Sequence, residues 1–339
     1  MRSLALMVNE YQFWMGGILA TQLEEITDDP KKVGDGGFWA ALISFEGVSS
    51  FARFSKVEER EFPQSDWEPI GTSWRSSLNR KSYIDYVSRI REAISLGGVY
   101  QVNACRELSN TVEDGSLTLD GLFSKLLQDN PAPFSSYLNI PGIEIASASP
   151  ELFLSRSGSA IKTSPIKGTI RENETAFGEK DKAENLMIVD LMRNDLGRIC
   201  KPGTVDVSEL FRQEKHPGLV HLVSDVAGEL NENTTWEQIL SATTPPGSVS
   251  GAPKSAALSM IGEIEGARGP YCGALGWING SEALLSVAIR TFWKIGDDTL
   301  RFGTGAGITW GSDPELEWEE TQLKARRLIS IAGGALSDS

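Results

Sequence analysis

A lysine in an expected turn is the residue of this sequence most suited to covalent chemistry. Lys167 lies in the segment Ser-Pro-Ile-Lys-Gly-Thr, residues 164–169, after two strand-like stretches at 150–155 and 160–163. An ammonium group in a poorly solvated pocket loses its proton more readily, so the free amine can attack an electrophilic carbon. Glu151, in the first of these strands, is a candidate general acid or base. The alternative is an ordinary exposed lysine between turn-forming proline and glycine.

Two glutamates indicate a site for a hard metal ion. Glu184 shares a helical face with apolar residues in an expected helix at 180–200, and Glu320 does so in an expected helix at 315–332. Carboxylates without a nearby histidine or cysteine suit Mg²⁺, which keeps waters and takes substrate oxygens. The alternative is an ion pair between each glutamate and a nearby basic residue. The candidates for such pairs are Arg193, Arg198 and Lys324.

Three further segments could bind an anion such as a carboxylate. The glycine-rich residues 303–307 offer several backbone N–H groups, but no helix follows them as a dinucleotide-binding fingerprint requires. Residues 247–255 imitate a P-loop, yet an Ala-Pro pair precedes the lysine where glycine is required, so nucleotide binding is rejected. The helix expected to start there could still hold a carboxylate. Arg290, in an expected strand at 283–293, suits bidentate carboxylate recognition; the alternative is an interior ion pair.

The histidines and cysteines indicate no catalytic centre of their own. His221 precedes an expected strand and suits a structural role at least as well as a catalytic one, while His216 is expected in a loop. Their spacing supports no Ser-His-Asp triad. The three cysteines are far apart, without a CxxC or Cys/His pattern, so neither a disulfide framework nor a zinc site is indicated. This pattern favours the reducing cytoplasm.

The composition excludes two classes of partner. The chain has 339 residues, of which 46 are acidic and 32 basic, and its net charge of −14 repels nucleic acid and anionic membranes. No run of about 18 apolar residues is present, so no membrane span is expected. The length and the 40% hydrophobic content allow a large buried core.

The expected elements must bring the candidate residues together. Strands cluster around helices without regular βαβ alternation, which favours an α+β fold over a parallel doubly wound sheet. Residues 1–75 are expected to form a shortened lead-in layer, and residues 76–339 the catalytic region of the same compact domain. The last three expected strands predict an antiparallel meander. The expected helices are 82–97, capped by Ser82, 120–128, 180–200 and 315–332, and the expected strands include 40–45, 99–103, 220–230, 271–278, 283–293 and 299–308.

Several motifs in the same order resemble the chorismate-utilising enzymes. The resemblance covers about residues 80–332, and the number and order of the motifs make it highly specific. It implies a fold of antiparallel sheets packed together with helices outside. The motifs are Pro-Ile-Lys-Gly-Thr at 165–169, the run at 184–198, Gly-Ala-Pro-Lys at 251–254, the glycines at 303–307, and Glu-Glu-Thr-Gln-Leu-Lys-Ala at 319–325.

Two positions resemble one branch of this family. Anthranilate synthases and isochorismate-type members carry alanine or another small residue where this chain has Lys167, and water-adding members carry lysine where it has Gln101. Both positions resemble component I of the aminodeoxychorismate synthases, the large subunit of para-aminobenzoate synthase. The resemblance implies Mg²⁺-dependent replacement of the chorismate 4-hydroxyl by an amino group, on the route to para-aminobenzoate and folate.

The same resemblance implies a role for each candidate residue. Lys167 would attack C2 of chorismate, Glu151 would protonate the departing hydroxyl, and His221 would lie near the reacting ring. Glu184 and Glu320 would hold Mg²⁺. The residues that would place or bind the substrate are Gln101, Gly168, Thr169, Ser248, Tyr271, Arg290, Gly305, Ala306, Gly307 and Lys324.

The ammonia source and two competing activities complete these expectations. Ammonia would come from a glutamine amidotransferase subunit, because no segment resembles a glutaminase domain with its cysteine nucleophile. One competing activity is that of anthranilate synthase component I, which eliminates pyruvate to give an aromatic product. The other is non-catalytic binding of chorismate-like carboxylates.

Overall fold

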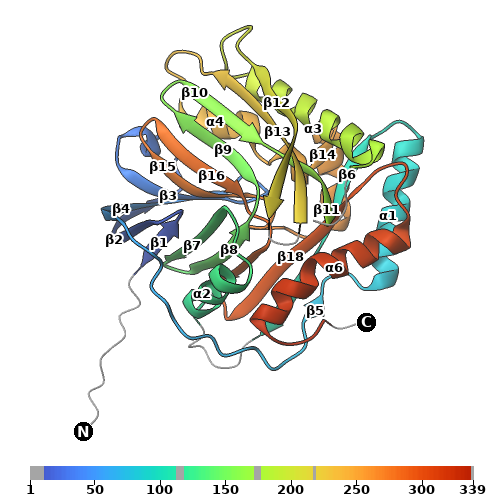
Figure 1. Cartoon of the computed structure of the whole chain (residues 1–339), viewed down its shortest axis with the longest axis horizontal. Helices are drawn as coiled ribbons and strands as arrows, with labels where there is room; N and C mark the ends of the chain where they lie inside the picture. The colour runs from blue at the N-terminus through green and yellow to red at the C-terminus, as the bar shows by residue number, and fades with distance from the viewer. Residues whose placement is uncertain (1–10, 112–117, 172–176, 217–218, 337–339) are drawn as a thin grey trace.

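A single antiparallel sheet with helices on its outside dominates the computed structural model, which describes residues 11–111, 118–171, 177–216 and 219–336 (Figure 1). The α+β fold expected from the sequence is confirmed. Among the described residues, no helix is long and apolar enough to cross a membrane.

The helices and strands have the following bounds. The helices are α1 (Arg80–Ser95), α2 (Asp120–Asp129), α3 (Glu179–Gly197), α4 (Trp236–Thr243), α5 (Lys254–Ile264) and α6 (Pro314–Ala332), with the 3-10 helices η1 (Lys32–Gly34) and η2 (Gly247–Val249). The strands are β1 (Gln12–Met15), β2 (Ile18–Thr27), β3 (Phe38–Ile43), β4 (Ser49–Glu59), β5 (Arg75–Ser76), β6 (Gln101–Thr111), β7 (Phe134–Ile140), β8 (Ile143–Ser149), β9 (Leu152–Ser157), β10 (Ala160–Ser164), β11 (Ile166–Arg171), β12 (Asp206–His216), β13 (Leu219–Glu229), β14 (Gly251–Ala252), β15 (Ala274–Asn279), β16 (Glu282–Val287), β17 (Thr291–Ile295) and β18 (Thr299–Ile308).

The sheet is a long ribbon whose two ends meet. From pair to pair, the strands run β6, β18, β17, β8, β7, β1, β2, β4, β3, β15, β16, β9, β10 and β13. β11 continues β10 along the same side of β13. Gly307 on β18 lies close to side chains of both β6 and β11, so the two ends of the ribbon converge near the centre of Figure 1.

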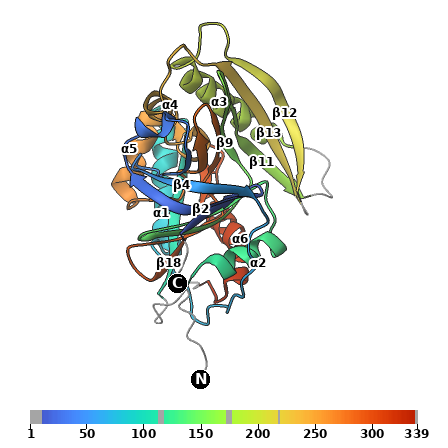
Figure 2. The same cartoon turned by 90° about the vertical axis from the view of Figure 1, so that its left-hand side faces the viewer.

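A buried apolar cluster fixes α6 against the ribbon. Residues of α2 and α6, which lie together in Figure 2, pack on Phe292 of β17 and on Leu300 and Phe302 of β18. Each large apolar side chain buried in this way contributes about 1.5–3 kcal/mol. The packing also fixes the helix that carries Glu320 and Lys324, two of the residues singled out in the sequence.

The ends of α1 follow from local capping. Tyr83, Tyr86 and Ile90 form its buried face, at the helical spacing expected from the sequence. The predicted cap at Ser82 was wrong, because the Asn79 side chain accepts a hydrogen bond from the Ser82 backbone N–H at 2.9 Å and is the true cap. Asparagine caps a helix as well as serine does, so residue type alone did not distinguish them.

The expected strand at 283–293 and the meander built on it were also wrong. β16 ends at Val287 and β17 begins at Thr291, and the two strands are not neighbours in the ribbon. β16 pairs with β15 and β9, whereas β17 pairs with β8 and β18. The chain therefore passes from one half of the ribbon to the other between them. A continuous apolar sequence gives no signal of such a crossing, because both strands are buried.

Candidate active site

Lys167, Gln101 and Gly307 meet where the ends of the ribbon converge. A Cβ atom on Gly307 would lie 2.6 Å from Gln101 Nε2 and 3.7 Å from Lys167 Nζ, so a larger residue would displace the Gln101 amide from its position beside Lys167. Gln101 is 1% exposed, and its Oε1 has no hydrogen-bond partner among the described residues. A buried amide oxygen without a partner is a group that a ligand can satisfy.

Lys167 is presented by an irregular strand. It lies in β11 rather than in a turn, and the pairing of β11 with β13 shifts register between Ile166 and Thr169. Gly168, at the irregularity, has a φ of +92°, and a Cβ there would lie 2.9 Å from Asp181 Cβ. The predicted turn was wrong because proline at the start of a strand and glycine at a bulge give the same sequence signal as a turn.

The environment of Lys167 favours its neutral amine. Burial lowers the pKa of Lys167, and the charge of Lys324 acts in the same direction. The carboxylates of Glu184 and Glu151 oppose this change but do not reverse it. Lys167 is therefore a better nucleophile than an exposed lysine would be.

Glu151 is a carboxyl group whose pKa is shifted upward, in the direction opposite to the pKa of Lys167. It precedes β9 directly and is 3% exposed. Burial raises the pKa of Glu151 to about 6, although a hydrogen bond from Ser248 and the charge of Lys167 oppose the shift. A carboxyl group with this pKa keeps part of its population protonated near neutral pH, as a general acid requires.

Arg290 and Tyr271 are the two residues that the resemblance assigns to a second carboxylate of the substrate. Arg290 lies between β16 and β17 with a φ of +52°, a conformation that costs a non-glycine residue about 1 kcal/mol. Burial lowers the pKa of its guanidinium, and the neighbouring charge of Arg327 adds to this effect. The Tyr271 ring stacks on Trp293 with 6.4 Å between ring centroids. A guanidinium group suits a ligand carboxylate.

Thr169 and His221 are joined across two strands. They are paired between β11 and β13, and Thr169 Oγ1 lies 2.8 Å from His221 Nδ1. This contact orients the imidazole ring. His221 lies within a strand rather than before it, and His216 ends β12 rather than lying in a loop.

The glycine-rich segment is an open strand edge rather than a nest. Gly305, Ala306 and Gly307 pair with β6 on one side, whereas β17 pairs with β18 only at Phe302 and Arg301. In the described part of the chain, residues 303–308 therefore have a partner strand on one side only. The backbone groups that point away from β6 remain able to bind a ligand.

Glu184 and Glu320 bring two carboxylates toward Lys167. Lys180 Nζ lies 3.9 Å from Glu184 Oε1, and Lys324 Nζ lies 2.6 Å from Glu320 Oε1. The expected alternative of a Glu320–Lys324 pair is thus present, whereas Glu184 has Lys180 rather than an arginine beside it. Lys324 also donates to the carbonyl oxygen of Gly305 at 3.1 Å.

The two glutamates form a donor set that fits Mg²⁺. Burial raises the pKa of Glu184, and the charge of Glu320 adds to this effect. Burial would also raise the pKa of Glu320, but the ion pair with Lys324 outweighs it and lowers that pKa. Among the described residues, no three His, Cys, Asp or Glu side chains gather at one point. Water and substrate oxygens would complete the coordination, as is typical of Mg²⁺.

One ion pair near the site was missed from the sequence. Lys254, noted in the failed P-loop and in the Gly-Ala-Pro-Lys motif, lies 2.6 Å from Asp195, and both side chains are largely buried. The pair joins the start of α5 to α3. Both residues lie within the motifs of the expected resemblance, which was the only sequence signal for them.

The structure is an α+β fold in which carboxylates and half-buried cations lie near one another, and comparison with known proteins agrees with this class. A model of the chorismate binding enzymes matches residues 44–330, so the chain belongs to this family. The matched region begins earlier than the resemblance expected from the sequence and ends close to it.

Curated relatives of two kinds are similar to this chain. It is 36% identical over 303 residues to aminodeoxychorismate synthase component 1 of Escherichia coli, covering 85% of this chain and 65% of the relative. It is 35% identical over 290 residues to anthranilate synthase component 1 1 of Haloarcula marismortui, covering 81% and 58%. The chain spans about three fifths of the length of these relatives.

Solved structures share the fold. The anthranilate synthase component I of Streptococcus pneumoniae superposes with a TM-score of 0.78 at 23% identity, covering 97% of this chain and 93% of that one. A putative isochorismate synthase of Bacillus anthracis gives a TM-score of 0.80 at 22% identity, covering 95% and 96%. The expected fold of chorismate-utilising enzymes is confirmed.

Proposed function

We propose that this protein aminates chorismate at C4 to give 4-amino-4-deoxychorismate. The observation that carries the proposal is the amine of Lys167, which belongs to a half-buried side chain, interacts with the charge of Glu151 and has a lowered pKa. An alanine at this position would supply no nucleophile. Glu151, whose pKa is raised to about 6, supplies the matching acid.

The chemistry proceeds in two substitutions. Lys167 Nζ attacks C2, the two conjugated ring double bonds each shift by one position, and the 4-hydroxyl leaves as water with a proton from Glu151. The Glu151 carboxylate then accepts the proton that the attacking amine releases. Ammonia attacks C4, the two double bonds shift back, and the C2–N bond breaks as Glu151 returns the proton to the departing Lys167 amine. The new C4 ammonium then passes a proton to the Glu151 carboxylate, which restores the acid. Chorismate and ammonia thus give aminodeoxychorismate and water.

Glu184 and Glu320 would hold Mg²⁺ in this proposal. The ion would supply positive charge at the ring carboxylate of the substrate. Gly168, Thr169, Ser248 and Lys324 would help to place the same carboxylate. His221, oriented by Thr169, would lie near the ring.

The enolpyruvyl carboxylate would lie against the second part of the site. Tyr271 and Arg290 would hold it, together with the open backbone edge of Gly305, Ala306 and Gly307. Gln101, which lies beside Lys167 and retains an unsatisfied amide oxygen, would contact the ring side. These assignments give the positive charges of Lys324 and Arg290 an anionic partner on the substrate.

A separate glutamine amidotransferase would supply the ammonia. A glutaminase needs an accessible cysteine nucleophile, whereas Cys105, Cys200 and Cys272 are all buried. The names of the curated relatives as component 1 support a two-component arrangement. Aminodeoxychorismate formed in this way would serve para-aminobenzoate and folate synthesis.

Anthranilate synthesis is the second candidate, because several relatives carry that name. Product analysis distinguishes the two. The protein is incubated with chorismate, Mg²⁺ and an ammonium salt, and the products are separated by chromatography with mass detection. We expect aminodeoxychorismate without fluorescent anthranilate, and para-aminobenzoate only after a lyase is added. Anthranilate as the main product would reject the proposal in favour of the second candidate. Binding of chorismate without any product would indicate a non-catalytic binder.

A further inference from the structure

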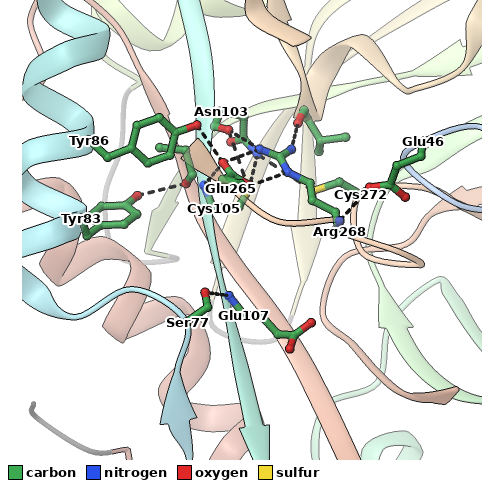
Figure 3. Close-up of polar contacts among 12 residues, drawn as sticks. Glu46, Ser77, Tyr83, Tyr86, Asn103, Cys105, Glu107, Glu265, Arg268 and Cys272 are labelled. Atoms are coloured by element: carbon green, nitrogen blue, oxygen red, sulfur yellow. Dashed lines mark hydrogen bonds and ion pairs between the residues drawn. The ribbon is translucent and has the colours of Figure 1, made fainter. Parts of the chain in front are cut away.

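A fully paired charge cluster lies beneath the site. Arg268 is 5% exposed, and its Nε and Nη2 donate to the two Glu265 carboxylate oxygens at 2.7 and 2.8 Å. Figure 3 shows the Glu265 carboxylate between Tyr86 and the Arg268 guanidinium. The Tyr86 hydroxyl and the Cys105 backbone N–H donate to Glu265 at 2.8 and 2.9 Å. Neither Glu265 nor Arg268 was singled out in the sequence.

The remaining donors of Arg268 hold two separate backbone segments. Nη2 donates to the Asn103 carbonyl oxygen on β6 at 2.7 Å, and Nη1 donates to the Val249 carbonyl oxygen in η2 at 3.0 Å. The Arg268 backbone N–H donates to Glu46 at 2.7 Å, which fixes the arginine from the opposite side. One planar side chain therefore joins β6 to η2, and it adds to the backbone bond from the Asn103 N–H to the Ser250 carbonyl oxygen at 2.9 Å.

Each of these segments carries a residue of the proposed site. Gln101 lies two positions before Asn103 on β6, and Ser248 directly precedes Val249. Ser248 hydrogen-bonds to Glu151, the proposed acid. The carbonyl oxygen of Arg268 accepts the Tyr271 backbone N–H at 3.2 Å. Arg268 does not contact Lys167 or Glu151. It is hydrogen-bonded instead to Asn103, Val249 and Tyr271.

We propose that Arg268 is a positioning residue that holds Ser248 and Gln101 at the spacing the reaction needs, with Glu265 fixing the guanidinium. The inference rests on the proposed function, because that function gives Ser248 and Gln101 their roles. Lysine cannot replace arginine here, since a single ammonium group cannot reach two carbonyl oxygens and a carboxylate in the same plane. A displacement of the Ser248 segment would also remove a hydrogen bond from Glu151.

A double-mutant cycle tests this role. Arg268→Lys, Ser248→Ala and the double variant are compared with wild type for the rate of chorismate loss. We expect Arg268→Lys to lower kcat about 10- to 100-fold with a smaller change in KM, because misplaced groups slow the chemical step. Ser248→Ala should lower kcat/KM about tenfold in wild type but less than about twofold in Arg268→Lys, since the two changes damage one unit.

Arg301→Lys is the matched control. Arg301 also forms a bidentate pair, with Asp297, and lies on β18, which pairs with β6. It is remote from Ser248, so its effect should add to that of Ser248→Ala. Additive effects for Arg268→Lys, or a loss of stability with unchanged kcat, would overturn the positioning role.

A second variant, Glu265→Gln, replaces Arg268→Lys in the cycle if Arg268→Lys does not fold. Glu265→Gln keeps an acceptor oxygen for Tyr86 and Cys105 but weakens the hold on Arg268, so it should show the same coupling to Ser248→Ala at smaller size. Chorismate loss is measured whichever product forms, so an anthranilate product would reject the proposed function without affecting the cycle. If no chorismate is consumed, calorimetry measures the Kd for chorismate of the same four proteins. Additive effects of Arg268→Lys and Ser248→Ala on that Kd would reject the inference.

Discussion

Two groups of buried polar residues, one with a member on β6 and one hydrogen-bonded to β6, differ in how their hydrogen bonds are satisfied. In the framework group, Glu265 and Arg268 have partners for both carboxylate oxygens and for the guanidinium. In the site group, Glu151 Oε1 and Gln101 Oε1 have none among the described residues. Burial shifts the pKa values of Glu151 and Lys167 toward their neutral forms, and the neighbouring groups oppose this shift without reversing it. The framework group fixes the backbone of β6 and η2, whereas the site group has oxygen atoms that can still accept a hydrogen bond from a ligand.

The largest effect should come from removing the site amine. Lys167→Ala should lower C4 amination by about 10⁴-fold or more, because the covalent step loses its nucleophile. The free energy of unfolding should not fall, since a buried amine with few partners contributes little stability. Product chromatography and urea denaturation measure the two quantities. Lys162→Ala is the control, because Lys162 is 43% exposed, pairs with Asp225 and should tolerate the change. Unaltered aminodeoxychorismate formation by Lys167→Ala would reject the nucleophile.

The framework group should respond in the opposite way. Glu265→Ala should lower the free energy of unfolding by about 3–5 kcal/mol, because it leaves the Arg268 charge and the Tyr86 hydroxyl without their acceptor. Asp297→Ala removes an exposed partner of Arg301 and should cost about 1 kcal/mol or less. Equal losses in urea denaturation would show that the two arginines are held alike, and the contrast between paired groups would fail.

The proposed metal ligands should affect the Mg²⁺ requirement rather than folding. Glu184→Gln should raise the Mg²⁺ concentration needed for half-maximal activity about 10- to 100-fold, since a neutral amide is a weaker ligand than a carboxylate. Titration of chorismate consumption with Mg²⁺ measures this. Glu179→Gln, on the same helix but 91% exposed, is the matched control. If Glu184→Gln and Glu179→Gln needed the same Mg²⁺ concentration for half-maximal activity, Glu184 would not be a metal ligand.

The smallest effect should be a pH-dependent gain in stability. The Glu151 pKa is raised from 4.5 to about 6, so its contribution to stability is present below pH 4.5 and is lost as pH rises through about 6. Glu151→Gln mimics the protonated form, so it should be more stable than wild type by about 2 kcal/mol above pH 6 and equal to it below pH 4.5. Denaturation at several pH values tests this. A constant difference across the range would contradict the raised pKa.

Most of the fold's elements could be predicted from local signals. The hydrophobic periodicity of the sequence predicts a helix at 315–332 and a strand at 299–308. The structure has them at Pro314–Ala332 and Thr299–Ile308. The break at Arg290 could not, because the crossing between halves of the ribbon depends on partners far away in the sequence. For the same reason Lys167 was expected in a turn, although the pairing with β13 makes it part of a strand.

The candidate site was largely proposed from family motifs rather than from spacing alone. Motif residues such as Lys167 and Gln101 do lie together, because β6, β11 and β18 converge. The framework pair was missed, because Glu265 and Arg268 carry an ordinary i,i+3 spacing that is usual on exposed surfaces. Only tertiary burial distinguishes them from a surface pair.

The left-handed backbone of Arg290 carries an evolutionary consequence. Glycine or asparagine would occupy that conformation with less strain, and neither would bury a positive charge. Directed evolution that screens only for heat resistance should therefore enrich glycine or asparagine at position 290. A screen that also demands growth without added product should retain arginine, so the two libraries would diverge first at this residue.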